Sequence, residues 1–125
     1  MKFEELTHKI IGRAMTFHHE LGTGFPERIY QRALALELES VWIKFLEEHS
    51  MDICYKGTRI GRRRVDFLVE DTIMLEIKAV DELNDTCLVQ TKNYLEIHGI
   101  KIGLLINFGG LSLQFKRIYN NKLYT

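Results

Sequence analysis

Two apolar segments separated by one helix length constrain the fold of this chain more than any other feature. The segments are Thr72–Val80 and Lys101–Phe108. Between them, residues 84–98 show helical spacing, with Leu88 and Leu95 on one face. A helix of this length can cross between neighbouring parallel strands. The sequence therefore predicts a parallel strand pair, with Lys101–Phe108 as a buried central strand.

The helices and strands around this pair complete a mixed pattern. Apolar residues recur every three or four positions from Phe3 to Leu21, which predicts a first helix that Gly22 and Gly24 end. Pro26 suits the start of a second helix, to about Ser40. Period-two alternation predicts further strands at Met51–Tyr55, Thr58–Val69 and Leu111–Tyr119. We expect the order ααβββαββ: an α/β fold, bordering on α+β, in which helices flank a mixed β-sheet.

Length and composition indicate one soluble domain. The chain has 125 residues, 46% hydrophobic and 27% charged, so we expect a single domain over residues 1–125. No apolar run approaches the roughly 20 residues of a membrane-spanning helix, and the charged N-terminus lacks a signal peptide. We therefore expect a cytoplasmic protein with no membrane contact, in which Cys54 and Cys87 are free thiols. The 17 basic and 17 acidic residues cancel, so nucleic-acid binding requires a local basic patch.

Polar residues interrupt two of the predicted strands. In the first strand, Asp66 points away from the face that period two gives to its apolar neighbours Val65, Phe67 and Val69. In the next strand, Glu76 and Lys78 share the face opposite the residues Ile73, Leu75, Ile77 and Ala79. Burying two carboxylates and an ammonium costs free energy unless another group compensates.

A divalent cation held by Asp66 and Glu76 supplies that compensation. Hard oxygen ligands favour Mg²⁺ or Mn²⁺, and the backbone carbonyl of Ile77 is a further candidate ligand. Lys78 projects on the same side, where it can act on an attacking water or stabilise a phosphate. The alternative is that Glu76 and Lys78 form ordinary ion pairs on a solvated sheet face.

The turn between these strands decides whether the carboxylates meet. We expect the strands to be adjacent and antiparallel, with Asp66 opposite Glu76 on one face. Because side chains alternate, this pairing requires an odd-length turn centred on Asp71, or a bulge. A two-residue turn at Glu70-Asp71 would place the carboxylates on opposite faces.

The ordered motifs of the chain resemble those of the PD-(D/E)XK nuclease superfamily. Asp66 and Glu76-x-Lys78 on consecutive strands match its core pattern, although Val65 stands where the superfamily has proline. More narrowly, Gly24-Phe-Pro-Glu27-Arg-Ile-Tyr30 resembles the motif of the GxxExxY protein family, a branch of that superfamily. Further segments match in order: His18–Gly22, Tyr55–Gly57, Asp66–Val69, Leu75–Val80, Gln90 with Asn93–Leu95, and Gly103–Phe108. The resemblance covers nearly the whole chain and implies a restriction-endonuclease-like sheet.

The resemblance also implies further site residues. Glu27 matches a helix glutamate that many members use as an extra metal or water ligand, and Gln90 matches a polar helix residue that lines such sites. Tyr30 and Tyr94 each lie one helical turn further on, and both are candidate substrate contacts. The alternatives are a helix N-terminal carboxylate for Glu27, core packing for Tyr30 and an exposed amide for Gln90.

One basic cluster precedes Asp66 on its strand: Lys56, Arg59, Arg62, Arg63 and Arg64. We expect Arg62, Arg63 and Arg64 to contact phosphates along a rim that leads to the metal. The alternative is an edge strand that its charges protect from aggregation.

We therefore expect a Mg²⁺- or Mn²⁺-dependent nuclease that hydrolyses phosphodiester bonds of DNA, with RNA as the less favoured substrate. Asp66, Glu76 and Lys78 form its catalytic core, with Glu27 and Gln90 around them. The chain has no obvious sequence-reading domain, so specificity depends on a partner, a homodimer or DNA shape. The alternative is a catalytically silent nucleic-acid-binding or assembly module with the same fold, which the neutral net charge supports.

Overall fold

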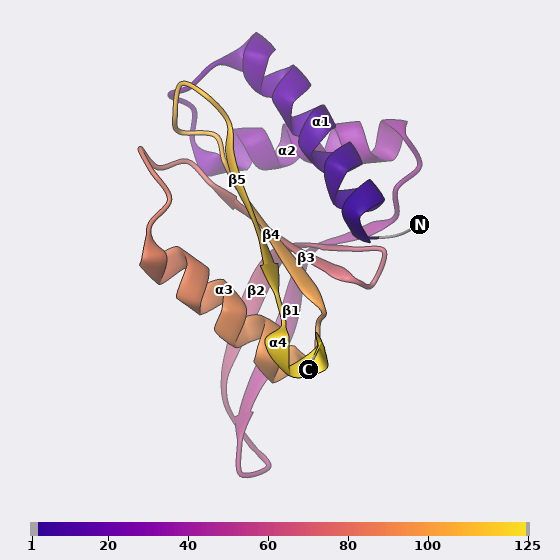
Figure 1. Ribbon diagram of the computed structural model, residues 1–125, viewed down its shortest axis with the longest axis vertical. Coiled ribbons are helices and arrows are strands. Elements are labelled where there is room, and N and C mark those ends of the chain that lie inside the picture. Colours follow the sequence, from indigo (N-terminus) through magenta and orange to yellow (C-terminus); the bar gives the residue numbers. More distant parts are fainter. Residues whose placement is uncertain (1–2, 125) are drawn as a thin grey trace.

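The computed structural model describes residues 3–124, which form one five-stranded sheet with helices on both faces (Figure 1). The elements follow one another as α1 (Phe3–Leu21), α2 (Glu27–Ser40), β1 (Phe45–Tyr55), β2 (Thr58–Val69), β3 (Ile73–Lys78), α3 (Asp85–His98), β4 (Ile102–Asn107), β5 (Gln114–Tyr119) and α4 (Asn121–Tyr124). Apart from the short α4, this is the predicted order ααβββαββ. The fold is therefore α+β, with a mixed five-stranded sheet flanked by helices, as expected from the sequence.

The strands lie in sheet order β1-β2-β3-β4-β5. Three neighbouring pairs are antiparallel, whereas β3 and β4 are parallel from Ile73↔Ile102 to Lys78↔Asn107. Helix α3 connects these two strands, as the spacing of the apolar segments predicts. Every residue of β4 is buried, which confirms its central place in the sheet.

The two faces of the sheet bury separate apolar clusters. Helices α1 and α2 cover one face, where Leu34 and Leu38 lie in one cluster with the inward side chains of β2, β3 and β4, among them Phe67, Leu75 and Leu104. Helix α3 covers the other face with a smaller cluster: Val65, Met74, Leu95 and Ile100. Helices on both faces leave little of β3 and β4 in contact with water, so a charged residue there must have a partner.

Helix α3 has strong signals at both ends. The side chain of Asn84 accepts a hydrogen bond from the Cys87 backbone N–H at 3.0 Å, so Asn84 is the N-cap. Gly99 ends the helix in the left-handed region, with φ 66°. Both residues match the helix limits expected from the sequence.

The limits of two strands differ from those expected. Strand β1 begins at Phe45 rather than Met51, because pairing with β2 extends as far as Phe45↔Val69. Its first half includes Glu47 and Glu48, which hide the period-two pattern. Strand β5 begins at Gln114 rather than Leu111, whose side chain is 96% exposed. The short helix α4 has no periodicity from which it can be predicted.

Asn107 holds the segment that follows β3 in place through side-chain hydrogen bonds. This buried side chain accepts from the Val80 N–H at 2.9 Å and donates to the Val80 carbonyl oxygen at 2.8 Å. Gly109 approaches the same backbone so closely that an added Cβ would overlap the Val80 carbonyl oxygen and lie 2.5 Å from its nitrogen. These contacts fix the path of the chain immediately after Lys78.

No helix within residues 3–124 is long and apolar enough to cross a membrane.

Gly109→Ala should destabilise the protein, whereas Gly12→Ala should not. The first substitution pushes a methyl group into the Val80 backbone, so we expect the free energy of unfolding to fall by about 1–3 kcal/mol. The second adds a methyl in open space on α1, where alanine is favoured over glycine by up to about 1 kcal/mol. Urea unfolding followed by circular dichroism measures both. Equal stability of the two variants would contradict the close approach at Gly109.

Candidate active site

The β2–β3 hairpin has the register that brings the two carboxylates together. Its last pairs are Phe67↔Leu75, Leu68↔Met74 and Val69↔Ile73, so the loop comprises three residues and is centred on Asp71. Glu70 and Asp71 both adopt positive φ, 52° and 57°. The predicted odd-length turn is therefore confirmed, and Asp66 and Glu76 are next in register beyond the last pair.

The two strands diverge at this point. The backbone ladder between β2 and β3 ends at Phe67↔Leu75, and the Ile77 N–H donates instead to the Asp66 carboxylate, with 2.7 Å between nitrogen and Oδ2. In an extended strand the N–H and C=O of one residue point to the same side. The Ile77 carbonyl therefore also faces the side from which Asp66 approaches.

The divergence reverses the faces of β2. We expected Val65 to share a face with Phe67 and Val69, and this is wrong. Phe67 and Val69 pack beneath α1 and α2, whereas Val65 packs against Met74 in the cluster under α3. Glu48, which lies opposite Asp66 between the regular pairs of β1 and β2, has φ 53°. A local twist of the paired strands at Asp66 accounts for the reversal.

Glu76 is an acidic side chain in a nearly dry setting. It is 3% exposed, and burial together with the neighbouring Asp66 raises its pKa to about 8, while Arg63 and Lys78 oppose the rise. The Arg63 guanidinium lies 3.1 Å from Glu76 Oε1. The contact lacks hydrogen-bond alignment, since neither Glu76 Oε1 nor Arg63 Nε has a hydrogen-bond partner among residues 3–124. This carboxylate oxygen is thus buried with unused capacity for a ligand.

Arg63 is part of the site rather than of an outer basic rim. Its guanidinium stacks over the Tyr94 ring, 4.3 Å from the centroid, while it pairs with Glu76. Tyr94 therefore holds Arg63 instead of standing free for substrate. Sequence reasoning placed all three consecutive arginines together. The signal that separates Arg63 is its register opposite Met51, which packs on the α3 side.

Arg62 and Arg64 lie outside the site. Both are exposed, and they pair with acidic residues of β1: Arg62 Nε lies 3.3 Å from Asp52 Oδ1 and Arg64 Nη1 lies 3.4 Å from Glu48 Oε2. The basic run thus divides between the two faces of the hairpin. Only Arg63 points toward Glu76.

Glu27 approaches the site from the first turn of α2. Its pKa is raised by burial, Lys78 opposes the rise and Asp66 adds to it, so its carboxyl lies within electrostatic range of both. It remains largely open to solvent at the rim. The structure thus brings Glu27, Asp66, Glu76 and Lys78 to one region, from a helix and two strands.

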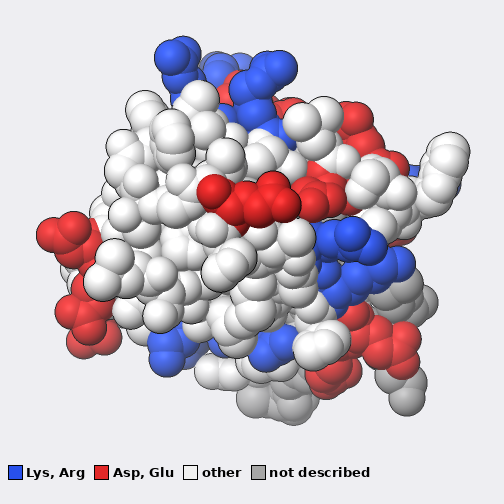
Figure 2. All heavy atoms as spheres, turned by 90° about the horizontal axis from the view of Figure 1, so that it is seen from above, with Lys and Arg blue, Asp and Glu red and all other residues white. Residues whose placement is uncertain are grey.

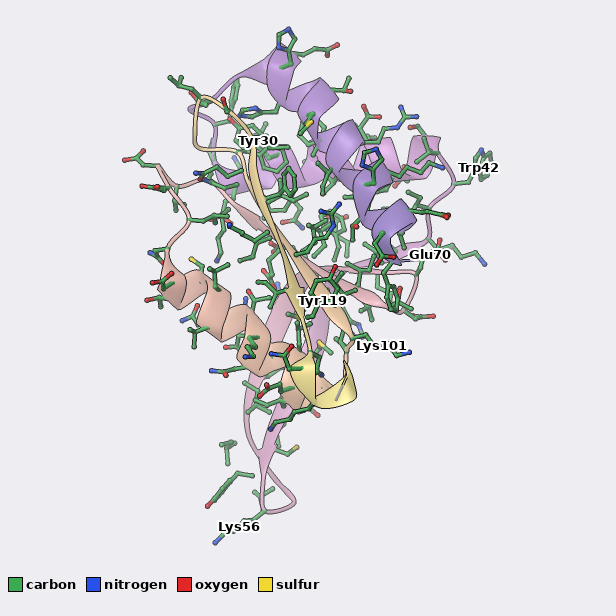
Figure 3. The ribbon with its side chains drawn as sticks, viewed as in Figure 1. Tyr30, Trp42, Lys56, Glu70, Lys101 and Tyr119 are labelled. Atoms are coloured by element: carbon green, nitrogen blue, oxygen red, sulfur yellow. The ribbon has the colours of Figure 1, made fainter. Side chains whose placement is uncertain are left out.

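Two of the predicted site residues, Tyr30 and Gln90, form no hydrogen bond with the acidic residues of the site. Tyr30 is fully buried, stacks on Phe108 with ring centroids 4.8 Å apart, and donates its hydroxyl to the Gly22 carbonyl at 2.7 Å (Figure 3). The expected substrate contact of Tyr30 is wrong, and core packing is its role. Gln90 is exposed on α3, and its side chain makes no hydrogen bond within the described residues.

The donor set fits a hard divalent cation. Two carboxylates and the Ile77 carbonyl converge where β2 leaves β3, and one carboxylate oxygen lacks a hydrogen-bond partner. Within residues 3–124 no group of three His, Cys, Asp or Glu side chains is placed to hold a metal. A cation here would therefore take two side chains, a backbone oxygen and water, as Mg²⁺ commonly does.

Comparison with protein families identifies the superfamily of the chain. The family described as the PD-(D/E)XK nuclease superfamily matches residues 4–118. The chain therefore belongs to the PD-(D/E)XK nuclease superfamily. No curated protein matches the sequence.

Solved structures share the fold at low sequence identity. The crystal structure of SSO0001 is 18% identical, with a TM-score of 0.59, and the match covers 74% of this chain and 50% of that one. An alkaline exonuclease from Laribacter hongkongensis is 14% identical, with a TM-score of 0.56, covering 78% of this chain and 57% of that one. The chain thus spans about half the length of these structures.

The metal-free protein should lose stability as pH rises from about 4.5 to about 8. The folded pKa of Glu76 is raised from 4.5 to about 8, so the native state keeps a proton that the unfolded chain releases. Its stabilisation is complete below the unfolded pKa and is lost as pH rises through the folded pKa. Urea unfolding in chelator across this range measures the slope.

Glu76→Gln is the control for this pH dependence. It removes the titrating group, so the slope should flatten in the same buffers. His98, whose pKa is lowered by burial, acts in the opposite direction at lower pH in both proteins and cancels in the comparison. The same slope in both proteins would exclude Glu76 as its source.

Proposed function

We propose that this chain is a divalent-metal-dependent nuclease that hydrolyses phosphodiester bonds of DNA, with RNA as the second candidate substrate. One observation supports this above the others: Asp66 and the buried Glu76 meet where β2 and β3 diverge, with Lys78 on the same strand. Membership of the nuclease superfamily supports the same reaction class. The exonuclease neighbour contributes the fold alone.

Asp66, Glu76 and the Ile77 carbonyl would hold the cation. Hard oxygen donors favour Mg²⁺ or Mn²⁺. When bound, such an ion polarises a phosphoryl oxygen and lowers the pKa of its water. Its positive charge would also offset the burial and the repulsion from Asp66 that raise the pKa of Glu76 in the metal-free protein.

The remaining residues have roles in positioning and charge. Lys78 would stabilise negative charge on the phosphate or orient the attacking water. Glu27, at the rim, would accept a hydrogen bond from that water, and Gln90 on α3 would approach it only with substrate present. Arg63 holds the Glu76 carboxylate, and Tyr94 holds Arg63.

The silent binding module is the second candidate. The observation that favours it is the Arg63–Glu76 ion pair, because the guanidinium already balances the charge of one proposed metal ligand. In that case the site is a structural ion pair, and the protein binds nucleic acid or a partner without turnover. We also propose the narrower GxxExxY branch, a cytoplasmic location and a possible homodimer, none of which decides between the two functions.

Asp66→Asn and Lys78→Ala should each abolish cleavage of DNA in Mn²⁺, by about 100-fold or more, because each removes a charge at the reacting phosphate. The matched controls are Glu20→Gln and Lys9→Ala, both on exposed positions of α1, and they should cleave like the parent. The measurement is the loss of a labelled DNA substrate on a denaturing gel, with an RNA of the same sequence in parallel.

The metal response separates the two candidate functions. With Mn²⁺ at one hundred times its Kd, the wild type should gain roughly 2.7 kcal/mol of stability. Asp66→Asn should lose this gain and keep its fold, since the amide can still accept from the Ile77 N–H. A wild type that shows neither a metal-induced rise in Tm nor cleavage would establish the silent module.

A further inference from the structure

The β1–β2 hairpin extends beyond the rest of the molecule, as Figure 1 shows at its lower end. Its strands remain paired out to Tyr55↔Thr58, and every residue from Cys54 to Ile60 is exposed. Lys56 lies at the tip, remote from the helices (Figure 3). Arg63 and Val65 still pack on the α3 side, so the strand projects from Gly61 to Thr58, about 10 Å at roughly 3.3 Å per residue. The outer end of the hairpin is therefore a short projecting arm.

The arm is an ordered ribbon rather than a loose loop. Lys56 and Gly57 form the turn with φ of 49° and 76°, the left-handed pair that matches the twist of a two-residue hairpin. The register is regular except for one shift between Ile53 and Cys54. Such an irregularity increases the local twist. Because residues 54–60 are all exposed, the outer end of the hairpin does not contribute to either apolar cluster.

Positive charge is concentrated on this arm. Residues 50–64 contain five basic residues and one acidic residue, Asp52, of the seventeen of each kind in the chain. The remainder therefore has twelve basic and sixteen acidic residues, a net charge opposite to that of the arm. The face at the upper end of the molecule shows both signs interspersed (Figure 2). Arg63 and Arg64 pair with Glu76 and Glu48, outside this range. The excess positive charge of the arm therefore comes from Lys56, Arg59 and Arg62 against the single Asp52.

The outer face of the arm carries more cations than its carboxylates balance. Arg59 and Arg62 share the single carboxylate of Asp52, at 3.9 Å and 3.3 Å, so all three lie on one face. Lys56 pairs with no carboxylate among the described residues, and its Nζ lies 5.5 Å from the Tyr55 ring centroid. Exposed ion pairs of this kind contribute little stability. A polyanion can displace them at low cost.

Exposed apolar side chains lie among these cations at the outer end. Tyr55 is 62% exposed and Ile60 is 67% exposed. Both flank the turn, where neither contributes to the core. Cations that contact phosphates, together with apolar groups that contact base edges, are the combination found where a protein enters a nucleic-acid groove.

We propose that the β1–β2 hairpin is an arm that enters the major groove of double-stranded DNA. This rests on the proposed function for its placement of the substrate, because the arm continues from the strand that ends at Asp66. The major groove of B-DNA is roughly 12 Å wide and admits a two-stranded ribbon. A projecting end of about 10 Å spans roughly three base pairs at 3.4 Å each. The major groove of double-stranded RNA is too narrow for side chains to read, so duplex DNA is the substrate class.

Binding to a labelled DNA duplex of two helical turns tests the arm. Fluorescence anisotropy in chelator prevents cleavage and allows a salt titration with the full chain. Lys56→Ser with Arg59→Ser should weaken binding at least tenfold and reduce the slope of log Kd against log salt by about 2, at roughly 0.9 per phosphate contact. Tyr55→Ser with Ile60→Ser should weaken binding and leave the salt slope unchanged. The control, Lys9→Ser with Lys116→Ser, removes two exposed lysines elsewhere and should bind like the parent.

The competing outcomes are distinct. Normal binding by the Lys56/Arg59 variant, or equal competition by an RNA duplex, would overturn the arm. A third outcome would also overturn the arm. If the free protein sediments as a dimer and the double variant Tyr55→Ser with Ile60→Ser sediments as a monomer, the arm is an interface between copies of the chain. Both arm variants should keep the Mn²⁺-induced rise in Tm, which shows that the fold is intact. Duplex binding through the arm without cleavage or a metal response would disprove the proposed activity and leave the arm standing.

Discussion

The hydrogen bond from the Ile77 N–H to the Asp66 carboxylate is the contact on which the site depends. A regular antiparallel ladder would satisfy this N–H with a backbone oxygen of β2, but the ladder stops at Phe67↔Leu75. Asp66 supplies the missing acceptor at 2.7 Å, so the strands can separate without leaving a buried donor unpaired. The separation directs the Ile77 carbonyl and two carboxylates toward one region. Asp66 therefore meets a hydrogen-bonding requirement of the backbone and also contributes a carboxylate to the candidate site.

The burial of Glu76 shows where the protein gives up stability for this arrangement. A carboxyl that is 3% exposed, with one oxygen lacking a hydrogen-bond partner, weakens the metal-free fold. Arg63 reduces that cost, and Tyr94 holds the guanidinium in place from α3. The compensation is incomplete, as the raised pKa of Glu76 shows. A carboxyl whose pKa is perturbed by burial and by a specific charged neighbour is typical of functional sites.

Period-two alternation and helix length predicted most of the fold and the hairpin register on which the candidate site depends. They gave the parallel β3–β4 pair and the three-residue turn that places Asp66 beside Glu76. They could not give the reversal of faces at Asp66, because alternation assumes a straight strand and Val65 is apolar on either face. The predicted substrate contact of Tyr30 was wrong for a related reason. Its helical position next to a motif does not reveal that its ring stacks on Phe108 in the core. The side of Arg63 depends on the same reversal.

That reversal also determines how one strand can serve two purposes. Beyond Asp66, β2 continues outward as half of the hairpin, and its arginines alternate between faces. Arg63 points inward to Glu76 on the α3 side, whereas Arg62 points to the outer face with Asp52. If β2 were regular through Asp66, Arg63 would lie on the α1–α2 side with Phe67, and Glu76 would lose its only cationic contact within hydrogen-bonding distance among the described residues. The twist at Asp66 therefore places a buried charge pair at the site and a basic outer surface on the arm along one continuous strand.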